Sequence, residues 1–252
     1  MKPVTIMKKS LFPVLLAIVM STGCTSFERR VTQSAEAMNS WANNDYVSCV
    51  NKSRNVIALA LEEQTDHFRA RALLGWCELA LGHLDEAETA FDELGRLSPA
   101  NFEAMLGSAW VKLARRQLTQ AEIALKESAR WASGAYLSPQ QSAEGWLAFY
   151  QGKLDLAEER FRAAERDLFH ENYTTTHVDH GVKRNWSTQP WVGLGWVEMY
   201  RGRPEASRKA FLKGLDRDPN CHDCYGGLAR LYMGLGQRTQ AFKFATKGLS
   251  LT

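Results

Sequence analysis

The chain has 252 residues, 45% of them hydrophobic and 23% charged, which suits one ordinary-sized domain with a buried core. The formal net charge is +3, but three of the 31 basic residues lie in the first 23 positions, which hold no acidic residue. The remaining 28 basic residues equal the 28 acidic ones, and this balance argues against nucleic acid as a partner.

The first residues have the pattern of an export signal. Two lysines precede an apolar run over residues 11–20, which is too short to anchor a protein stably across a bilayer. The run ends in Met-Ser-Thr-Gly-Cys, which resembles a bacterial lipoprotein signal with Cys24 as the acylated first residue of the mature chain. The resemblance implies a signal peptide over residues 1–23, a tether over residues 24–33 and a lipid anchor on the periplasmic face of the outer membrane. The alternative is an ordinary secretory peptide with a chance cysteine.

Helical periodicity begins near Ser34 and is clearest over residues 67–99. There, two apolar-periodic segments of about 13 residues lie on either side of Gly82. Gly75 and Ala87 are small, so the two predicted helices can cross closely at these positions. One hairpin of this size buries too little apolar surface to offset the entropy of ordering it, so the pattern must recur.

The pattern does recur, at a spacing of 34 residues. Ala109 follows Gly75 at this spacing, and Ala229 follows Gly195. Small crossing residues, a turn glycine and a closing proline at this period resemble the tetratricopeptide repeat, a helix–turn–helix unit of 34 residues. The resemblance implies an all-α, right-handed solenoid of about six units over residues 34–252.

One interval departs from the period. Gly145 and Gly195 occupy equivalent positions in the fourth and fifth units but lie 50 residues apart, so 16 residues are inserted, within about 166–190. The insertion has little helical periodicity. Long insertions in a solenoid lie on one face and are often functional.

Three histidines lie in the insertion: His170, His177 and His180. We interpret them as solvated loop side chains, which is a commoner outcome than a metal site. The sequence shows no Ser–His–Asp, P-loop or paired-carboxylate signature. It therefore predicts no metal, no cofactor and no enzyme activity.

A tryptophan directly follows the small residue of the first helix in four units, and a large apolar side chain follows three residues later. The candidate groove residues at these positions are Trp76, Trp110, Trp146, Phe149, Trp196 and Met199. In the repeats that the chain resembles, this line of positions faces a concave groove that binds an extended peptide. Exposed tryptophan also stacks on sugar rings, so a glycan is a second candidate ligand. The opposing interpretation, that the indoles pack between neighbouring helices, stays open because large aromatic side chains are usually buried.

Four cysteines remain after Cys24, an even number in a chain expected in an oxidising compartment. Cys221 and Cys224 open the sixth unit, where a local disulfide, two inert thiols or a redox pair would each fit. A haem motif needs a histidine directly after the second cysteine, and structural zinc needs a second pair of ligands, so neither is expected. Cys49 and Cys77 lie in neighbouring units and are placed to bridge them.

The last predicted helix, residues 239–249, is followed by three residues, which leaves no room for the polar capping helix of a solenoid. Phe242, Phe244 and Leu249 therefore lack a neighbouring unit, and we expect some of this surface to bind the partner or a second copy of the chain. The alternative is that the two phenylalanines fold back onto the fifth unit.

The leader, the repeats and the cysteines together indicate a membrane-anchored, periplasm-facing scaffold that binds another protein, as an extended peptide or a helix. By family resemblance, we expect it to assist assembly of an envelope machine, such as a type IV or tight-adherence (Flp) pilus or its secretin. The alternative is a glycan-binding module in polysaccharide export or peptidoglycan synthesis.

Overall fold

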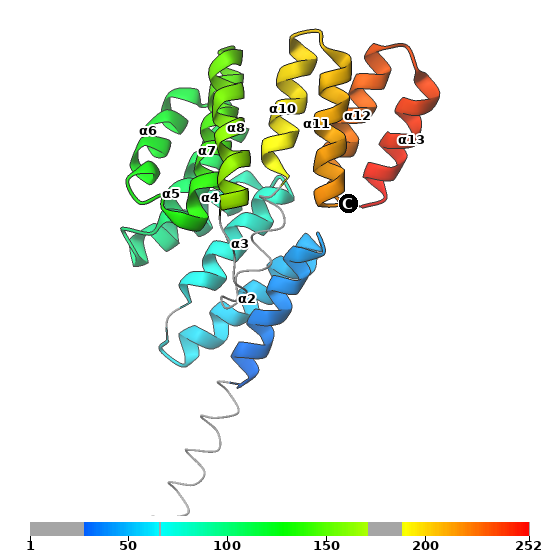
Figure 1. Ribbon diagram of the computed structural model, residues 1–252. Helices are drawn as coiled ribbons and strands as arrows, with labels where there is room; N and C mark the ends of the chain where they lie inside the picture. Colours follow the sequence, from blue (N-terminus) through cyan, green and yellow to red (C-terminus); the bar gives the residue numbers. More distant parts are fainter. Residues whose placement is uncertain (1–27, 66, 171–187, 252) are drawn as a thin grey trace, which may run out of the picture.

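The computed structural model describes residues 28–65, 67–170 and 188–251, and every regular element in these ranges is helical (Figure 1). Cys24 and most of the insertion, with His177 and His180, lie outside the described residues. The described helices form six hairpins, which we call units one to six. In chain order the hairpins are residues 28–42 with α2 (Tyr46–Glu62), α3 (Phe68–Ala80) with α4 (Leu84–Leu97), α5 (Phe102–Ala114) with α6 (Leu118–Ala129), α7 (Leu137–Tyr150) with α8 (Leu154–His170), α10 (Gln189–Tyr200) with α11 (Pro204–Arg217), and α12 (His222–Gly234) with α13 (Arg238–Leu249). A 3₁₀ turn, Gly134–Tyr136, precedes α7.

The turn inside each hairpin places one residue in the left-handed backbone conformation. In unit two this residue is Gly82, at φ 78°, where glycine has no Cβ to clash. Units one and three use Asn44 (φ 61°) and Arg116 (φ 60°) instead. Asparagine is the more tolerant of these two side chains in this conformation.

Phenylalanine rings seated between glycines join successive units. Phe91 of α4 lies between Gly75 of α3 and Gly107 of α5, and a Cβ on either glycine would come within 3.0 Å of the ring. Phe161 in unit four and Phe211 in unit five occupy equivalent places, and all three rings are fully buried. Their glycine partners are Gly145 and Gly193 for Phe161, and Gly195 and Gly227 for Phe211. Because each ring contacts glycines of two units, it fixes the packing of one unit on the next.

The predicted all-α solenoid of about six units is confirmed, with differences at its boundaries. Residues 28–33, expected to be part of the tether, belong to the first helix. They lack apolar periodicity, and an ion pair between Arg30 and Glu63 at 2.9 Å joins this end of the helix to the end of α2. The expected insertion is also helical at both ends, because α8 continues to His170 and α10 begins at Gln189.

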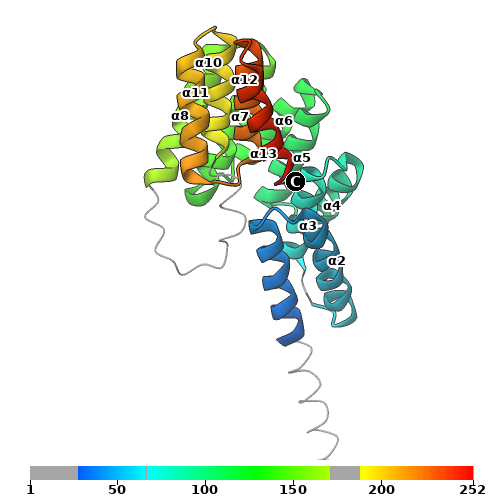
Figure 2. The same cartoon turned by 90° about the vertical axis from the view of Figure 1, so that its right-hand side faces the viewer.

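The solenoid curves until its first unit approaches its last. In Figures 1 and 2 the turn after the first helix (blue) lies next to the start of α12 (orange). Asn44 Nδ2 in that turn donates a hydrogen bond to the backbone oxygen of Asn220 at 3.4 Å. The two ends of the repeat array therefore meet across its inner side.

The C-terminal helix leaves part of its apolar surface in water. Phe244 stacks on Tyr232 of α12, with ring centroids 5.4 Å apart and an interplanar angle of 12°. Phe242 and Leu249 are each 74% exposed. Of the two phenylalanines in α13, Phe244 is thus covered and Phe242 is not. Phe244 packs against its own unit and not, as the alternative from the sequence had it, against unit five.

Candidate functional site

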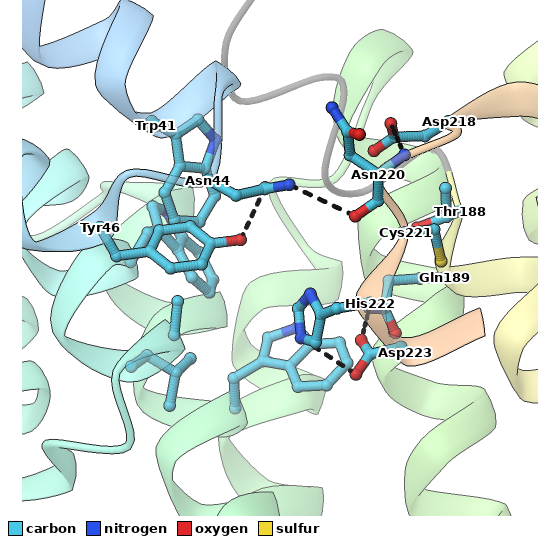
Figure 3. A pocket seen from close by; sticks show the side chains of 14 residues that line it. Trp41, Asn44, Tyr46, Thr188, Gln189, Asp218, Asn220, Cys221, His222 and Asp223 are labelled. Carbon is cyan, nitrogen blue, oxygen red and sulfur yellow. Dashed lines mark hydrogen bonds and ion pairs between the residues drawn. The ribbon is translucent and has the colours of Figure 1, made fainter. Parts of the chain in front are cut away.

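A hollow of about 240 Å³ lies where the first unit meets the loop before α12 (Figure 3). One wall comes from units one to three and is aromatic. The other comes from the start of α10 and the loop between α11 and α12, and is polar. The site therefore exists only because the solenoid curves back on itself.

The aromatic wall consists of Trp41, Tyr46, Trp76 and Trp110. Trp41 lies near the end of the first helix and meets Tyr46 edge-on, with ring centroids 5.4 Å apart. Trp76 is 3% exposed and packs edge-on against Phe91 at 4.8 Å, so its position is set by the core. Trp110 is half-buried. Two stacked repeats and the first turn thus hold the four rings in place.

The loop before α12 positions the polar wall. The Asp218 carboxylate accepts a hydrogen bond from the backbone N–H of Asn220 at 2.9 Å, which shapes the loop. Cys221 caps α12, and its sulfur accepts a hydrogen bond from the N–H of Cys224 at 3.1 Å. A disulfide also joins these two cysteines, with Cα atoms 5.3 Å apart, so the first turn of α12 is covalently closed.

A short chain of hydrogen bonds runs behind the polar wall. Trp146 Nε1 donates to Gln189 Oε1 at 3.0 Å, and Gln189 Nε2 donates to Asp223 Oδ2 at 3.5 Å. His222 Nε2 lies 3.2 Å from the other oxygen of Asp223. Through this chain, the tryptophan of unit four orients a carboxylate of the hollow.

His222 and Asp223 shift each other's protonation. The hydrogen bond to Asp223 raises the pKa of His222 above its ordinary value, against the effect of burial. Burial alone would raise the pKa of Asp223, but the hydrogen bond and charge of His222, together with Gln189, outweigh it and lower that pKa. Asp223 is therefore an anion at neutral pH.

The structure places the six candidate groove residues in two environments. Trp76 and Trp146 are buried, whereas Trp110, Phe149, Trp196 and Met199 are half-buried. Three of the tryptophans pack against a phenylalanine of their own unit. The pairs are Trp76 with Phe91 at 4.8 Å, Trp146 with Phe161 at 5.4 Å and Trp196 with Phe211 at 6.1 Å. Two of the four tryptophans, Trp76 and Trp146, thus belong to the core, and the other two pack against it. The choice between groove and core stays a prediction.

Only two of the six residues, Trp76 and Trp110, line the hollow. Phe149 packs edge-on against Tyr200 at 5.1 Å, and Met199 borders a separate surface depression beside α12. Neither of these two cavities extends through all six positions. Partner binding by these residues stays a prediction.

Of the residues that line the hollow, only Trp76 and Trp110 were predicted as ligand-binding residues. Trp41 and Tyr46 flank a polar turn, and this pair of aromatics was a visible signal in the sequence. The carboxylates Asp218 and Asp223 had no such signal, because their closeness to unit one depends on the curvature of the array.

All four described cysteines are in disulfides. Cys49 of α2 is joined to Cys77 of α3, with Cα atoms 6.2 Å apart, and this bond links unit one to unit two. The bond between Cys221 and Cys224 is local. These are the two pairings considered from the sequence.

Two arginine clamps outside the lining of the hollow reinforce the joints between units. Arg115, at the end of α5, contacts Asp85 and Glu88 at the start of α4. Arg201, at the end of α10, contacts Asp155 and Glu158 at the start of α8. The hydrogen bond from the arginine lowers the pKa of Glu88 and, in the second clamp, of Glu158. The same arrangement of one arginine and two carboxylates thus connects units two and three and, again, units four and five.

The described ranges contain neither a candidate membrane span nor a candidate metal site. None of their helices combines the length and the apolar character that crossing a bilayer requires. No group of histidine, cysteine, aspartate or glutamate side chains in them is arranged to hold a metal ion.

Comparison with protein families matches a tetratricopeptide repeat model to residues 53–101, 73–135 and 192–247, together just over half of the chain. A curated relative, the CTR9 homolog protein of Arabidopsis thaliana, is 26% identical over 208 residues. This match covers 71% of the present chain and 19% of the relative, so the chain spans about a fifth of that protein's length.

Solved structures share the fold at low sequence identity. A thermophilic TPR protein of Thermus thermophilus superposes with a TM-score of 0.60 and 18% identity, over 82% of this chain and 98% of that one. PilW, a widely conserved type IV pilus biogenesis factor, gives 0.54 and 14%, over 85% and 90%. Pseudomonas aeruginosa PilF gives 0.51 and 16%, over 73% and 76%. At these identities the likeness concerns the fold alone, and it agrees with the solenoid described above.

Proposed function

Because the chain belongs to the tetratricopeptide repeat family, we propose that it is a non-enzymatic scaffold that binds a segment of another protein in the aromatic hollow. The observation that carries this proposal is the hollow itself, in which four aromatic rings face a polar wall from the other end of the array. Concave sites that combine aromatic faces with a few fixed polar groups are the usual form of a binding site.

The mechanism is passive. The disulfides, the seated phenylalanines and the arginine clamps hold the two walls in place before the partner arrives. A preorganised site loses less conformational entropy on binding than a flexible one. No cofactor takes part in this mechanism.

We also propose that the protein lies at the outer membrane, on its periplasmic face, held by acyl chains such as palmitate on Cys24. The leader pattern supports this location, and so do the two disulfides, which persist in oxidising compartments. The shared fold with PilF and PilW supports a role in assembling a type IV or Flp pilus, or its secretin. The partner is then a periplasmic segment of such a machine.

Site-directed photo-cross-linking in the native host tests the binding site. A photoreactive amino acid replaces Asn44, at the edge of the hollow, and in a matched control it replaces the exposed Glu86 of α4. We expect one light-dependent protein adduct from position 44 and none from position 86. Equal adducts from both positions, or none from position 44, contradict the proposal.

A separate experiment tests the anchor. The Cys24→Ala variant should lose incorporated palmitate and leave the membrane fraction. Retention of the variant in the membrane, together with an unlabelled native chain, would rule out the lipid anchor without affecting the binding site.

The second candidate function is a glycan-binding module in polysaccharide export or peptidoglycan synthesis. The combination of tryptophan faces with the amides of Asn44 and Gln189 favours it, because sugar rings stack on indole and hydrogen-bond to amides. Calorimetric titration with peptidoglycan fragments and exopolysaccharide oligosaccharides tests it. Saturable binding that is lost in Trp110→Ala would support the glycan function.

A further inference from the structure

The lining of the hollow has an excess of negative charge. Among the described residues that line it, Asp218 and Asp223 carry carboxyl groups and none is lysine or arginine. His222, the titratable side chain beside them, is already paired with Asp223 at 3.2 Å. The full chain has 31 basic and 28 acidic residues, so this excess belongs to the hollow and not to the protein in general.

Both carboxylates retain acceptor capacity. An ionised carboxylate offers about four acceptor positions. His222 and Gln189 occupy two of those on Asp223, and the backbone N–H of Asn220 occupies one on Asp218. A donor that enters the hollow can therefore bond to either group without displacing these contacts.

The aromatic wall also favours a cationic ligand. The faces of tryptophan and tyrosine rings attract cations, and this attraction grows when the cation is shielded from water. A neutral ligand stacks on the same rings but gains less from the negative charge opposite, and an anion is repelled by it. Rings on one wall and carboxylates on the other thus favour a positively charged group between them.

We propose that the hollow recognises a cationic side chain of the partner polypeptide, with arginine preferred to lysine; this inference rests on the proposed function above. The guanidinium group is planar, stacks on aromatic rings and bonds to carboxylates through two parallel N–H groups. At about 240 Å³ the hollow is below the roughly 300–1,000 Å³ of typical ligand pockets, so it admits one long side chain rather than a folded element.

The protein already makes a contact of this kind close by. The guanidinium carbon of Arg116 lies 3.5 Å from the ring centroid of Tyr150. Tyr150 packs on Trp146, with ring centroids 5.6 Å apart, and Trp146 bonds to Gln189 in the lining of the hollow. The inner side of this solenoid therefore accommodates an arginine against an aromatic ring.

A set of matched peptides tests the inference on the full-length protein in detergent. The peptides are acetyl-Gly-Gly-X-Gly-Gly-amide, with arginine, lysine, citrulline or glutamate at X, and binding is followed by tryptophan fluorescence and calorimetry. Citrulline has the shape of arginine without its charge. We expect the arginine peptide to bind best and the lysine peptide next. The citrulline peptide should bind at least about tenfold more weakly than the arginine peptide, because it loses one charge-assisted hydrogen bond. Glutamate should not bind.

Isosteric variants of the two carboxylates test whether the hollow is where the arginine peptide binds. Asp223→Asn and Asp218→Asn should each lower the affinity for the arginine peptide, and Asp216→Asn, an exposed position of α11 outside the lining, should leave it unchanged. Equal binding of the arginine and citrulline peptides, full affinity in both lining variants, or no peptide binding at all overturns the inference. If the cross-link from position 44 persists in those cases, protein binding stands and only the cationic preference fails. If the oligosaccharides bind instead and the cross-link is absent, both proposals fail in favour of the glycan.

Discussion

Asn44 and Asn220 lie 176 residues apart in the chain, yet the side-chain amide of the first donates a hydrogen bond to the backbone carbonyl of the second. At 3.4 Å in an exposed position, this bond is weak. It nevertheless marks the place where the two walls of the hollow meet. The meeting point of the two walls thus carries a contact that contributes little to the stability of the fold.

This contact can be removed while the turn keeps its backbone conformation. Asn44→Gly allows the left-handed conformation at φ 61° and deletes the amide, together with the hydrogen bond that Asn44 Oδ1 accepts from Tyr46 at 2.9 Å, so the free energy of unfolding should fall by about 1–2 kcal/mol at most. The two ends should move more freely. Spin labels at the exposed positions 51 and 216 should show a broader distance distribution in the variant, and an unchanged distribution would mean that packing alone holds the ends together.

The glycine seat of Phe91 gives a second prediction. Gly107→Ala places a methyl group against the ring and should lower the free energy of unfolding by about 1–3 kcal/mol, measured by urea denaturation. The control is Gly226→Ala in α12, where nothing lies within 4 Å of the added Cβ, and which should stabilise the helix by about 0.5–1 kcal/mol. Unit three carries Leu125 at the position of Phe91, and unit four carries Ala143 at the position of Gly107. Adding Phe91→Leu to Gly107→Ala should therefore recover part of the loss.

The second arginine clamp gives a third prediction. Arg201→Met removes the nearer partner of Glu198, a buried residue whose remaining cation, Arg203, lies at 3.5 Å. The variant should lose about 1–3 kcal/mol, because a buried carboxylate loses hydrogen bonds. Arg208→Met, which breaks an exposed pair with Glu205, should leave the free energy of unfolding nearly unchanged. Equal losses in the two variants would show that the clamp adds nothing beyond a surface ion pair.

The pair of His222 and Asp223 makes stability depend on pH. The pKa of His222 is raised above 6.5 in the folded protein, so its contribution is full below that pH and is lost as the pH rises through the higher folded value. The pKa of Asp223 is lowered below 3.8, so its contribution is present above that pH and is lost as the pH falls through the lower folded value. Asp218 adds a smaller attraction to protonated His222.

His222→Gln should therefore flatten the decline in stability as the pH rises above about 6.5. The change should be less than about 1 kcal/mol, because the pair is partly exposed. Thermal unfolding at several pH values measures it, with His67→Gln as the control outside the hollow. Parallel profiles for the native chain and His222→Gln would contradict the prediction.

The two phenylalanines of the last helix should behave differently. Phe244→Ser removes a ring stacked on Tyr232 and should destabilise the protein by about 1–3 kcal/mol. Phe242→Ser changes a side chain that is 74% exposed and should leave stability nearly unchanged. If this end binds a second copy of the chain, Phe242→Ser should lower the mass measured by analytical ultracentrifugation. Identical mass at every concentration would exclude that role for Phe242.

Local patterns predicted the repeats well because their determinants are local. Gly82 indicates a turn, and the spacing from Gly75 to Ala109 gives the repeat period. Both features are determined by residues within one or two hairpins. Only one of the two glycines that contact Phe91 could be predicted from the repeat pattern. The second, Gly107, belongs to the next unit and is not one of the positions that define the repeat.

The hollow was not predictable in the same way. Its walls meet only after the small rotations of successive units have accumulated, and each rotation depends on how side chains such as Phe91 and Leu125 fit the neighbouring helix. Nothing near Asp218 in the sequence indicates that Trp41 will be across the cavity. The placement of aromatic rings opposite carboxylates is therefore a property of the assembled array.

The bond between Cys49 and Cys77 also determines how the molecule carries a mechanical load. If the chain is tethered at its N-terminal end, a pulling force reaches Cys49 and then passes through the sulfur atoms to Cys77, bypassing the 28-residue interval between them. That interval, which includes most of α2, cannot lengthen while the bond is intact. Fully extended, this interval would add about 95 Å to the length of the chain, and the disulfide prevents that extension. Under tension, the disulfide therefore keeps the end of α3 from separating from the start of α2.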